Sequence, residues 1–141
     1  IVGNTTFKES AVRAGELGIN AGFTFIQAMA NEDANAMPQY YATTQPLEAA
    51  TGMPTTVVWT GIPQAPLGNF QVQWVAERLC IAPLPVTDVY AQCQLSQSDQ
   101  MASNKAGSPL FQNPPIKYYR ITARITGPRG TEQYVQSLVS R

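Results

Sequence analysis

Residues 117–126 read Lys-Tyr-Tyr-Arg-Ile-Thr-Ala-Arg-Ile-Thr, which is the clearest structural pattern in the chain. Its side chains alternate in character, which is typical of a strand with one face toward a core and the other toward water. The first face carries Tyr119, Ile121, Ala123 and Ile125, and the second carries Tyr118, Arg120, Thr122, Arg124 and Thr126. Gly-Pro-Arg-Gly at 127–130 supplies turn residues, and residues 131–139 return as a second strand. The sequence therefore predicts a C-terminal antiparallel hairpin.

A further strand is predicted at residues 70–80, where the apolar side chains of Phe70, Val72, Trp74 and Ala76 alternate with polar ones. Two proline-rich, polar segments, at residues 31–69 and 81–115, separate the regular elements and read as surface connections. Within the first connection we expect a short helix near residues 45–51 and a strand at residues 55–60.

The N-terminal segment is predicted to be one helix over about residues 5–31, because it contains no proline and its small apolar residues recur every three or four positions. Gly15, Gly18 and Gly22 would each cost about 1 kcal/mol relative to alanine inside a helix. A helix that keeps them is expected to approach a neighbouring backbone closely.

The fold class predicted from this order is α+β, a single domain over residues 1–141 with the helix packed on an antiparallel sheet of about four strands. The 141 residues include 44% hydrophobic side chains, enough for a core, and nine basic residues balance nine acidic ones. Because nucleic-acid binding needs a basic excess, this balance argues against a nucleic-acid partner.

Catalytic chemistry is not indicated by any motif in the chain. There is no histidine, which excludes a Ser-His-Asp triad, a Cys-His dyad and histidine-ligated zinc. The carboxylates are scattered except for Glu32 and Asp33, which lack the spacing of a calcium loop and read as the polar end of a helix. We therefore predict that the protein is not an enzyme and has neither a cofactor nor a metal site.

Cys80 and Cys93 are the two cysteines of the chain. Two ligands cannot hold a structural zinc, and their spacing is not that of a Cys-x-x-Cys redox centre. We favour a disulfide and an oxidising compartment, with two unpaired buried thiols as the alternative. The bridge would stabilise the fold by about 3 kcal/mol in the chain-entropy model.

Charge is distributed unevenly along the chain, since residues 100–141 hold six cations and the single acidic residue Glu132. Arg120 and Arg124 fall on the polar face of one predicted strand. Two interpretations stay open: a solvated strand face, or electrostatic contact with an acidic neighbour in an assembly.

Three segments together resemble type IV pilus minor pilins of the PilX type. The first is Gly3-Asn4-x-x-Phe7-Lys-Glu-Ser-Ala11 followed by Ala14-Gly-Glu-Leu-Gly18, and the second is the central Glu77-Arg-Leu-Cys80. The third is the ending, Tyr118-Tyr-Arg-Ile-Thr-Ala-Arg-Ile-Thr-Gly-Pro-Arg129 with Tyr134-Val-Gln136. The two proline-rich connections carry no such resemblance.

The resemblance implies a pilin-like head without enzymatic activity, which sits with other minor pilins at the pilus tip, primes assembly and carries a large tip adhesin. It also implies a head in the periplasm at the bacterial inner membrane before assembly, and then an extracellular pilus. The membrane would be contacted through an apolar segment upstream of Ile1, encoded after a short basic leader and a cleavage site. Residues 5–16 would then have little sheet to pack on, and Phe7, Ala11, Ala14 and Gly18 would contact other helices of the filament.

Two alternatives remain at this point. A pseudopilin of a type II secretion system shares the helix-and-sheet plan. A glycan- or surface-binding adhesin module would use the aromatic residues in or near the loops, which are Tyr40, Tyr41, Trp59 and Tyr90.

Overall fold

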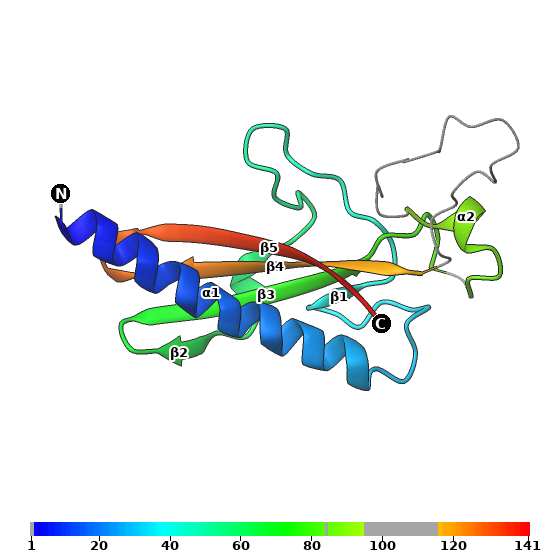
Figure 1. Ribbon diagram of the computed structural model, residues 1–141, viewed down its shortest axis with the longest axis horizontal. Helices are drawn as coiled ribbons and strands as arrows, with labels where there is room; N and C mark the ends of the chain where they lie inside the picture. The colour runs from blue at the N-terminus through cyan, green and yellow to red at the C-terminus, as the bar shows by residue number, and fades with distance from the viewer. Residues whose placement is uncertain (1, 84, 95–115) are drawn as a thin grey trace, which may run out of the picture.

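A computed structural model describes residues 2–83, 85–94 and 116–141, without the side chains of residues 2–9. It has an α+β architecture in which one long helix lies across a five-stranded sheet (Figure 1). The helices are α1 (Val2–Ala28) and α2 (Val89–Gln92), with 3-10 turns at Trp59–Gly61 and Pro128–Gly130. The strands are β1 (Tyr40–Tyr41), β2 (Ala65–Leu67), β3 (Phe70–Arg78), β4 (Tyr118–Thr126) and β5 (Glu132–Ser140).

The sheet is mixed rather than purely antiparallel, which corrects the predicted sheet of about four antiparallel strands. Its order is β1-β3-β4-β5, with β2 also paired to β3. β3, β4 and β5 form the predicted antiparallel core, whereas β1 runs parallel to β3. With two residues, β1 is too short to show an alternating pattern and could not be predicted from the sequence.

Helix α1 packs against β3, β4 and β5 along a seam of small residues. A Cβ atom built on Gly18 would lie 2.9 Å from both the Ala123 Cβ and the Val72 Cγ1, and one on Gly15 would lie 2.6 Å from the Val135 Cγ2. The predicted close approach is therefore confirmed, and the neighbour is the sheet of the same domain. The helix ends at Ala28, three residues before the predicted end.

The first proline-rich connection is irregular, and the helix expected at 45–51 and the strand expected at 55–60 were both wrong. Residues 45–60 form turns and the start of a 3-10 turn instead. The backbone N–H of Thr55 donates to the carbonyl of Pro46 (2.9 Å), and Leu47 and Pro54 form an isolated bridge. Prolines at both ends of this small hairpin remove the donors that a longer helix or strand would need.

Residues 42–62, which we call the covering segment, lie on the sheet face opposite α1. Three side chains of that face reach its carbonyl oxygens: Gln73 donates to Trp59 (2.6 Å) and Ile62 (3.0 Å), Gln136 to Gly52 (2.9 Å) and Arg120 to Gln45 (3.4 Å). The sheet is thus covered on both faces. Within the described residues, no helix is long and apolar enough to span a bilayer.

Candidate functional site

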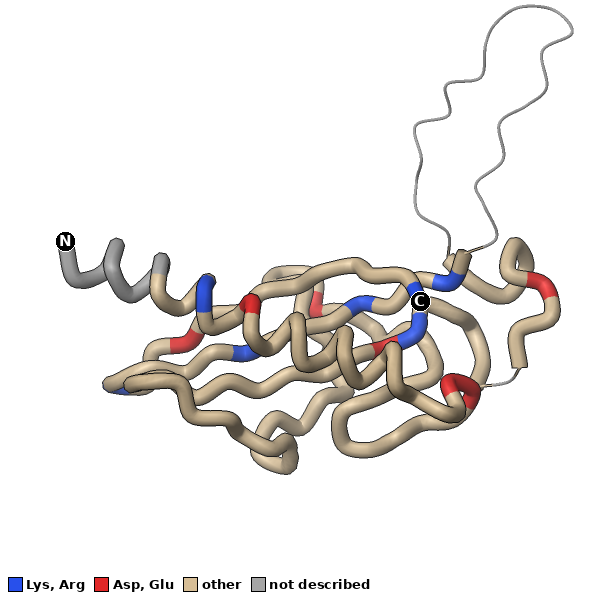
Figure 2. The backbone as a smooth tube through the Cα atoms, turned by 60° about the horizontal axis from the view of Figure 1, so that its bottom comes forward, with Lys and Arg blue, Asp and Glu red and all other residues tan. Residues whose placement is uncertain are grey.

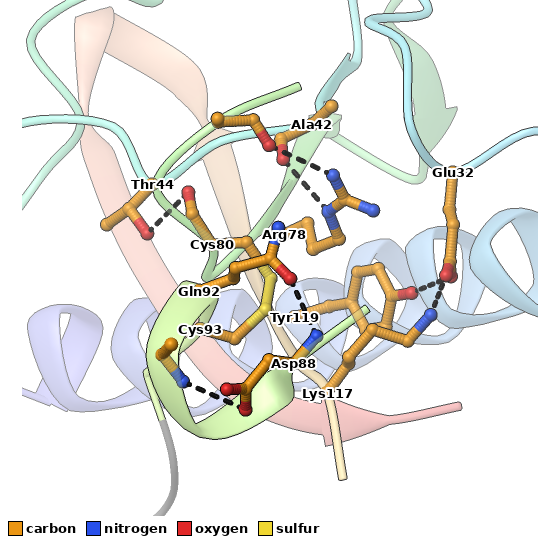
Figure 3. Close-up of a disulfide and its surroundings, with 12 residues drawn as sticks. Glu32, Ala42, Thr44, Arg78, Cys80, Asp88, Gln92, Cys93, Lys117 and Tyr119 are labelled. Carbon is orange, nitrogen blue, oxygen red and sulfur yellow. Dashed lines mark hydrogen bonds and ion pairs between the residues drawn. A yellow bond between two sulfur atoms is a disulfide. The ribbon is translucent and has the colours of Figure 1, made fainter. Parts of the chain in front are cut away.

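The predicted disulfide between Cys80 and Cys93 is present, with an S–S distance of 2.09 Å (Figure 3). It joins the chain just after β3 to the residue that follows α2. Two backbone hydrogen bonds flank it, from Ile81 N–H to the Gln92 carbonyl and from Gln94 N–H to the Leu79 carbonyl, both 2.8 Å. We call residues 80–93, of which residue 84 is not described, the disulfide loop.

Helix α2 is held within this loop by two side chains. Asp88 accepts hydrogen bonds from the backbone N–H groups of Tyr90 (3.1 Å) and Ala91 (3.3 Å) and so caps α2. The Gln92 Oε1 accepts from the backbone N–H groups of Thr87 (2.8 Å) and Asp88 (2.7 Å). Residues 80–81 and 87–93 of the loop are therefore held both by the covalent bridge and by polar contacts.

A charged cluster joins the end of α1 to the strands (Figure 3). Glu32 accepts from Lys117 and from the Tyr119 hydroxyl, and Arg141 approaches it at 3.3 Å. An open polar pocket of about 470 Å³ lies here, lined in part by Glu32, Asp33, Lys117 and Arg141. Burial, and then the nearby Arg141 charge, lowers the pKa of Lys117.

Beside this cluster, Arg78 is fully buried and bridges two loops. It donates to the Asp33 carboxylate (2.6 Å) and to the Ala42 carbonyl (3.0 Å). The Tyr40 hydroxyl donates to the Glu32 carbonyl (2.7 Å), and burial is the main cause that raises the pKa of Tyr40 to about 12. These contacts lock the segment after α1 onto the sheet, so the acidic pair singled out in the sequence has a structural role.

The basic stripe expected on β4 is covered and internally paired, which corrects the expectation of a solvated strand face. Arg120 forms an ion pair with Glu77, its cross-strand neighbour, and both side chains are largely buried. Arg124 donates to the Gln73 Oε1 (2.9 Å) and to Glu132 (2.6 Å). Burial lowers the pKa of Arg120. Contact of either arginine with another subunit stays a prediction.

The helix residues chosen as an assembly surface also face inward where they are described. Ala11 and Ala14 are fully buried in a cluster with Val72, Ala123 and Ile125, and Gly18 lies over the same strands. This corrects the expectation that the first half of the helix has little sheet to pack on. The side chain of Phe7 lies outside the described residues.

The aromatic residues considered for an adhesive surface do not form one. Tyr40 and Tyr41 are buried. Trp59 packs edge-on against Tyr134, with ring centroids 6.0 Å apart. Tyr90, in the disulfide loop, is half exposed. An aromatic contact surface built from all four is therefore wrong.

An apolar groove that sequence reasoning missed lies between α1 and the β2–β3 hairpin. It has a volume of about 120 Å³ and is lined by Leu17, Gly18, Ala21, Ala65, Pro66, Leu67, Val72 and Trp74. Leu17 and Leu67 are exposed at its rim. One sequence signal was Leu17, an apolar residue that follows the polar Arg13 and Glu16 in the first half of the helix.

Chemically, the described residues bring charges together as ion pairs and leave apolar groups at the surface. They contain no group of three or more Asp, Glu, Cys or His side chains placed to hold a metal ion. Comparisons with known protein families, with curated proteins and with solved structures found no match to this chain.

Proposed function

We propose that this chain is the head of a minor pilin, a structural subunit that takes part in assembling a type IV pilus and in adhesion at its tip. One observation carries the proposal. The three segments that resemble minor pilins, far apart in the sequence, meet in a single structural unit formed by α1, β3, β4 and β5.

The contacts between these segments are direct. The Glu77–Cys80 segment begins in β3, where Glu77 pairs with Arg120 and Arg78 pairs with Tyr119 of β4. The first segment lies in α1, whose Ala11 and Ala14 pack on the same strands. A common packing unit is what a shared fold preserves, while loops at the periphery vary.

The proposed partners are other minor pilins and a tip adhesin, and the proposed location is the bacterial inner membrane before assembly and the pilus afterwards. The disulfide supports an oxidising compartment, because such bridges persist outside the cytoplasm. No residue is assigned a catalytic or cofactor-binding role.

The test is deletion of the gene in its own bacterium, followed by counting surface pili by electron microscopy and measuring secretion. Loss of pili, restored by the wild-type gene and by a Gln27→Asp control at an exposed helix position, is the expected result. Normal pili with lost secretion would instead identify a pseudopilin. Normal pili with normal secretion would overturn the assembly function.

A further inference from the structure

The two edges of the sheet differ in how well they are protected against pairing with another chain. At one edge lie β1 and β2, which are two and three residues long, and β2 contains Pro66. Between them, the Gln39 side chain donates to the Trp74 carbonyl of β3 (3.1 Å). Short strands, prolines and covered backbone groups are means by which proteins block an edge. The other edge is β5, which is nine residues long, contains no proline and pairs with β4 without a bulge.

Alternate residues of β5 point their backbone N–H and C=O groups away from β4. The Gly127 N–H donates to the Thr131 carbonyl (2.8 Å), and these two residues continue the register in which Thr126 lies opposite Glu132. Because bonded and non-bonded pairs alternate along an antiparallel ladder, the odd-numbered residues of β5 bond β4 and the even-numbered ones point outward. The outward residues are Glu132, Tyr134, Gln136, Leu138 and Ser140. Within the part of the chain that the structure describes, no other strand, turn or side chain bonds their backbone groups.

Charge does not protect this edge either. Residues 133–140 contain no Lys, Arg, Asp or Glu, and Figure 2 shows a tan run along β5 up to the C-terminal end. The Leu138 side chain, on an outward-pointing residue, is 57% exposed. A long, uncharged edge with unpaired backbone groups is a template for a further strand. The edge of β5 is therefore a surface for strand addition.

The strand that matches this edge is β5 of a second copy. Antiparallel pairing centred on Gln136 overlaps all nine residues of each strand. It places every outward residue opposite an outward residue, so that their N–H and C=O groups exchange hydrogen bonds. Tyr134 then lies opposite Leu138 of the other copy, twice in the pair, and cross-strand side-chain contacts stabilise a sheet.

The charges of the strand favour the same arrangement. Glu132 is the one charged residue of β5, and it forms an ion pair with Arg124 of its own copy. In the antiparallel pair the two Glu132 side chains lie at opposite ends, each opposite Ser140 of the other copy. A parallel pair in register would instead place the two carboxylates side by side, where like charges destabilise a sheet. The chain carries no net charge, so two copies do not repel one another at long range.

We propose that two copies associate through β5 in an antiparallel, two-fold pairing that joins their sheets into one. The contact is isologous, since both copies use the same edge, and it closes at a dimer because the pairing leaves neither β5 edge free. It concerns the protein alone in solution and does not depend on the proposed pilus function.

Analytical ultracentrifugation of the 141-residue protein, up to about 1 mM, tests the association. We expect a monomer–dimer equilibrium and nothing larger. Leu138→Lys places a cation on the edge and removes both contacts with Tyr134, so the dimer should be about tenfold weaker. Met37→Lys is the matched control, because Met37 is 62% exposed and lies beside β1 at the protected edge. It should dimerise like the wild type.

Cysteine cross-linking tests the register. In a Gln136→Cys variant the new thiols of the two copies lie directly opposite one another, so a short bismaleimide should join them into a covalent dimer. Gln27→Cys, at an exposed position near the end of α1, should give only background cross-linking. Peptide mapping would verify the native disulfide in both variants.

Monomeric wild-type protein at about 1 mM would overturn the proposal, as would assemblies larger than a dimer. Unchanged dimerisation of Leu138→Lys, or equal cross-linking of the two cysteine variants, would also overturn it. Near-ultraviolet circular dichroism would verify folding, and Leu138→Asp would replace Leu138→Lys if that variant failed to fold.

Discussion

The two faces of the central sheet are covered by different means. On one face, α1 packs through alanine, glycine and larger apolar side chains against the apolar residues of β3, β4 and β5. On the other face, the covering segment contacts polar side chains, among them Gln73 and Arg120. The comparison shows that an alternating strand pattern separates an apolar face from a polar one, but does not decide which face is open to water.

Loss of a single interaction partner should lower the stability of the protein more on the polar face of the sheet than on the apolar face. Glu77→Gln leaves the largely buried Arg120 without its carboxylate, so we expect the free energy of unfolding to fall by about 3–5 kcal/mol. Urea unfolding would measure this. The exposed Glu16→Gln is the matched control and should change the free energy by less than about 0.5 kcal/mol.

Replacing both members of the Glu77–Arg120 pair separates the effect of an unpaired charge from the effect of the charges themselves. Glu77→Leu combined with Arg120→Leu removes both charges, and we expect most of the lost stability to return, because no unpaired charge remains. If the double variant were as unstable as Glu77→Gln, the polar face would depend on the charges themselves rather than on their pairing.

On the apolar face, added side-chain volume rather than loss of a partner should lower the stability of the protein. Gly18→Val places methyl groups where a Cβ already lies 2.9 Å from the Ala123 Cβ, an atom that cannot rotate away. We expect a loss of about 1–3 kcal/mol in thermal or urea unfolding. Asn20→Val, two positions along and exposed, should change stability far less, and an equal loss there would argue that helix propensity rather than close packing governs α1.

Tyr40 is a polar residue in the core on the α1 side of the sheet. Among these variants, its substitution is expected to change the free energy of unfolding least. Tyr40→Phe leaves the Glu32 carbonyl without this donor and should cost about 1 kcal/mol at neutral pH. Burial, the largest cause, raises the pKa of Tyr40 to about 12 in the folded protein, whereas an unfolded tyrosine titrates near 10.

The folded state therefore keeps this proton when the unfolded state has lost it, and the stabilisation is lost as pH rises from about 10 to about 12. The stability gap between wild type and Tyr40→Phe should therefore close at about pH 11 and reverse before about pH 12, because each pH unit above 10 removes about 1.4 kcal/mol. A gap that stayed constant would mean that the hydroxyl is as accessible in the folded protein as in the unfolded one.

Much of the fold could be predicted from the sequence, because long elements carry a periodic pattern. The alternation in β4 and the small-residue spacing in α1 each extend over many residues, and two cysteines allow only one pairing. The two-residue strand β1 and the covering segment carry no such pattern.

The candidate site was harder to predict, because its contacts join residues far apart in the sequence. Asp33 and Arg78 are 45 positions apart, and Glu32 and Lys117 are 85 apart. Arg120 and Arg124 were recognised as a stripe on one strand face. Their internal partners were not, because a single strand's pattern does not reveal which charges lie opposite it.

The covered polar face is tested most directly by thiol labelling at Thr122. This side chain is 1% exposed on that face and accepts a hydrogen bond from Gln136 (3.1 Å), which also donates to Gly52 of the covering segment. In a Thr122→Cys variant, with the native disulfide verified by peptide mapping, labelling should be about 100-fold slower than in an exposed Thr60→Cys variant. This protection corresponds to a local opening that costs about 3 kcal/mol. Equal labelling rates in the two variants would show that this face is open to solvent, as the interpretation of a solvated basic stripe expects.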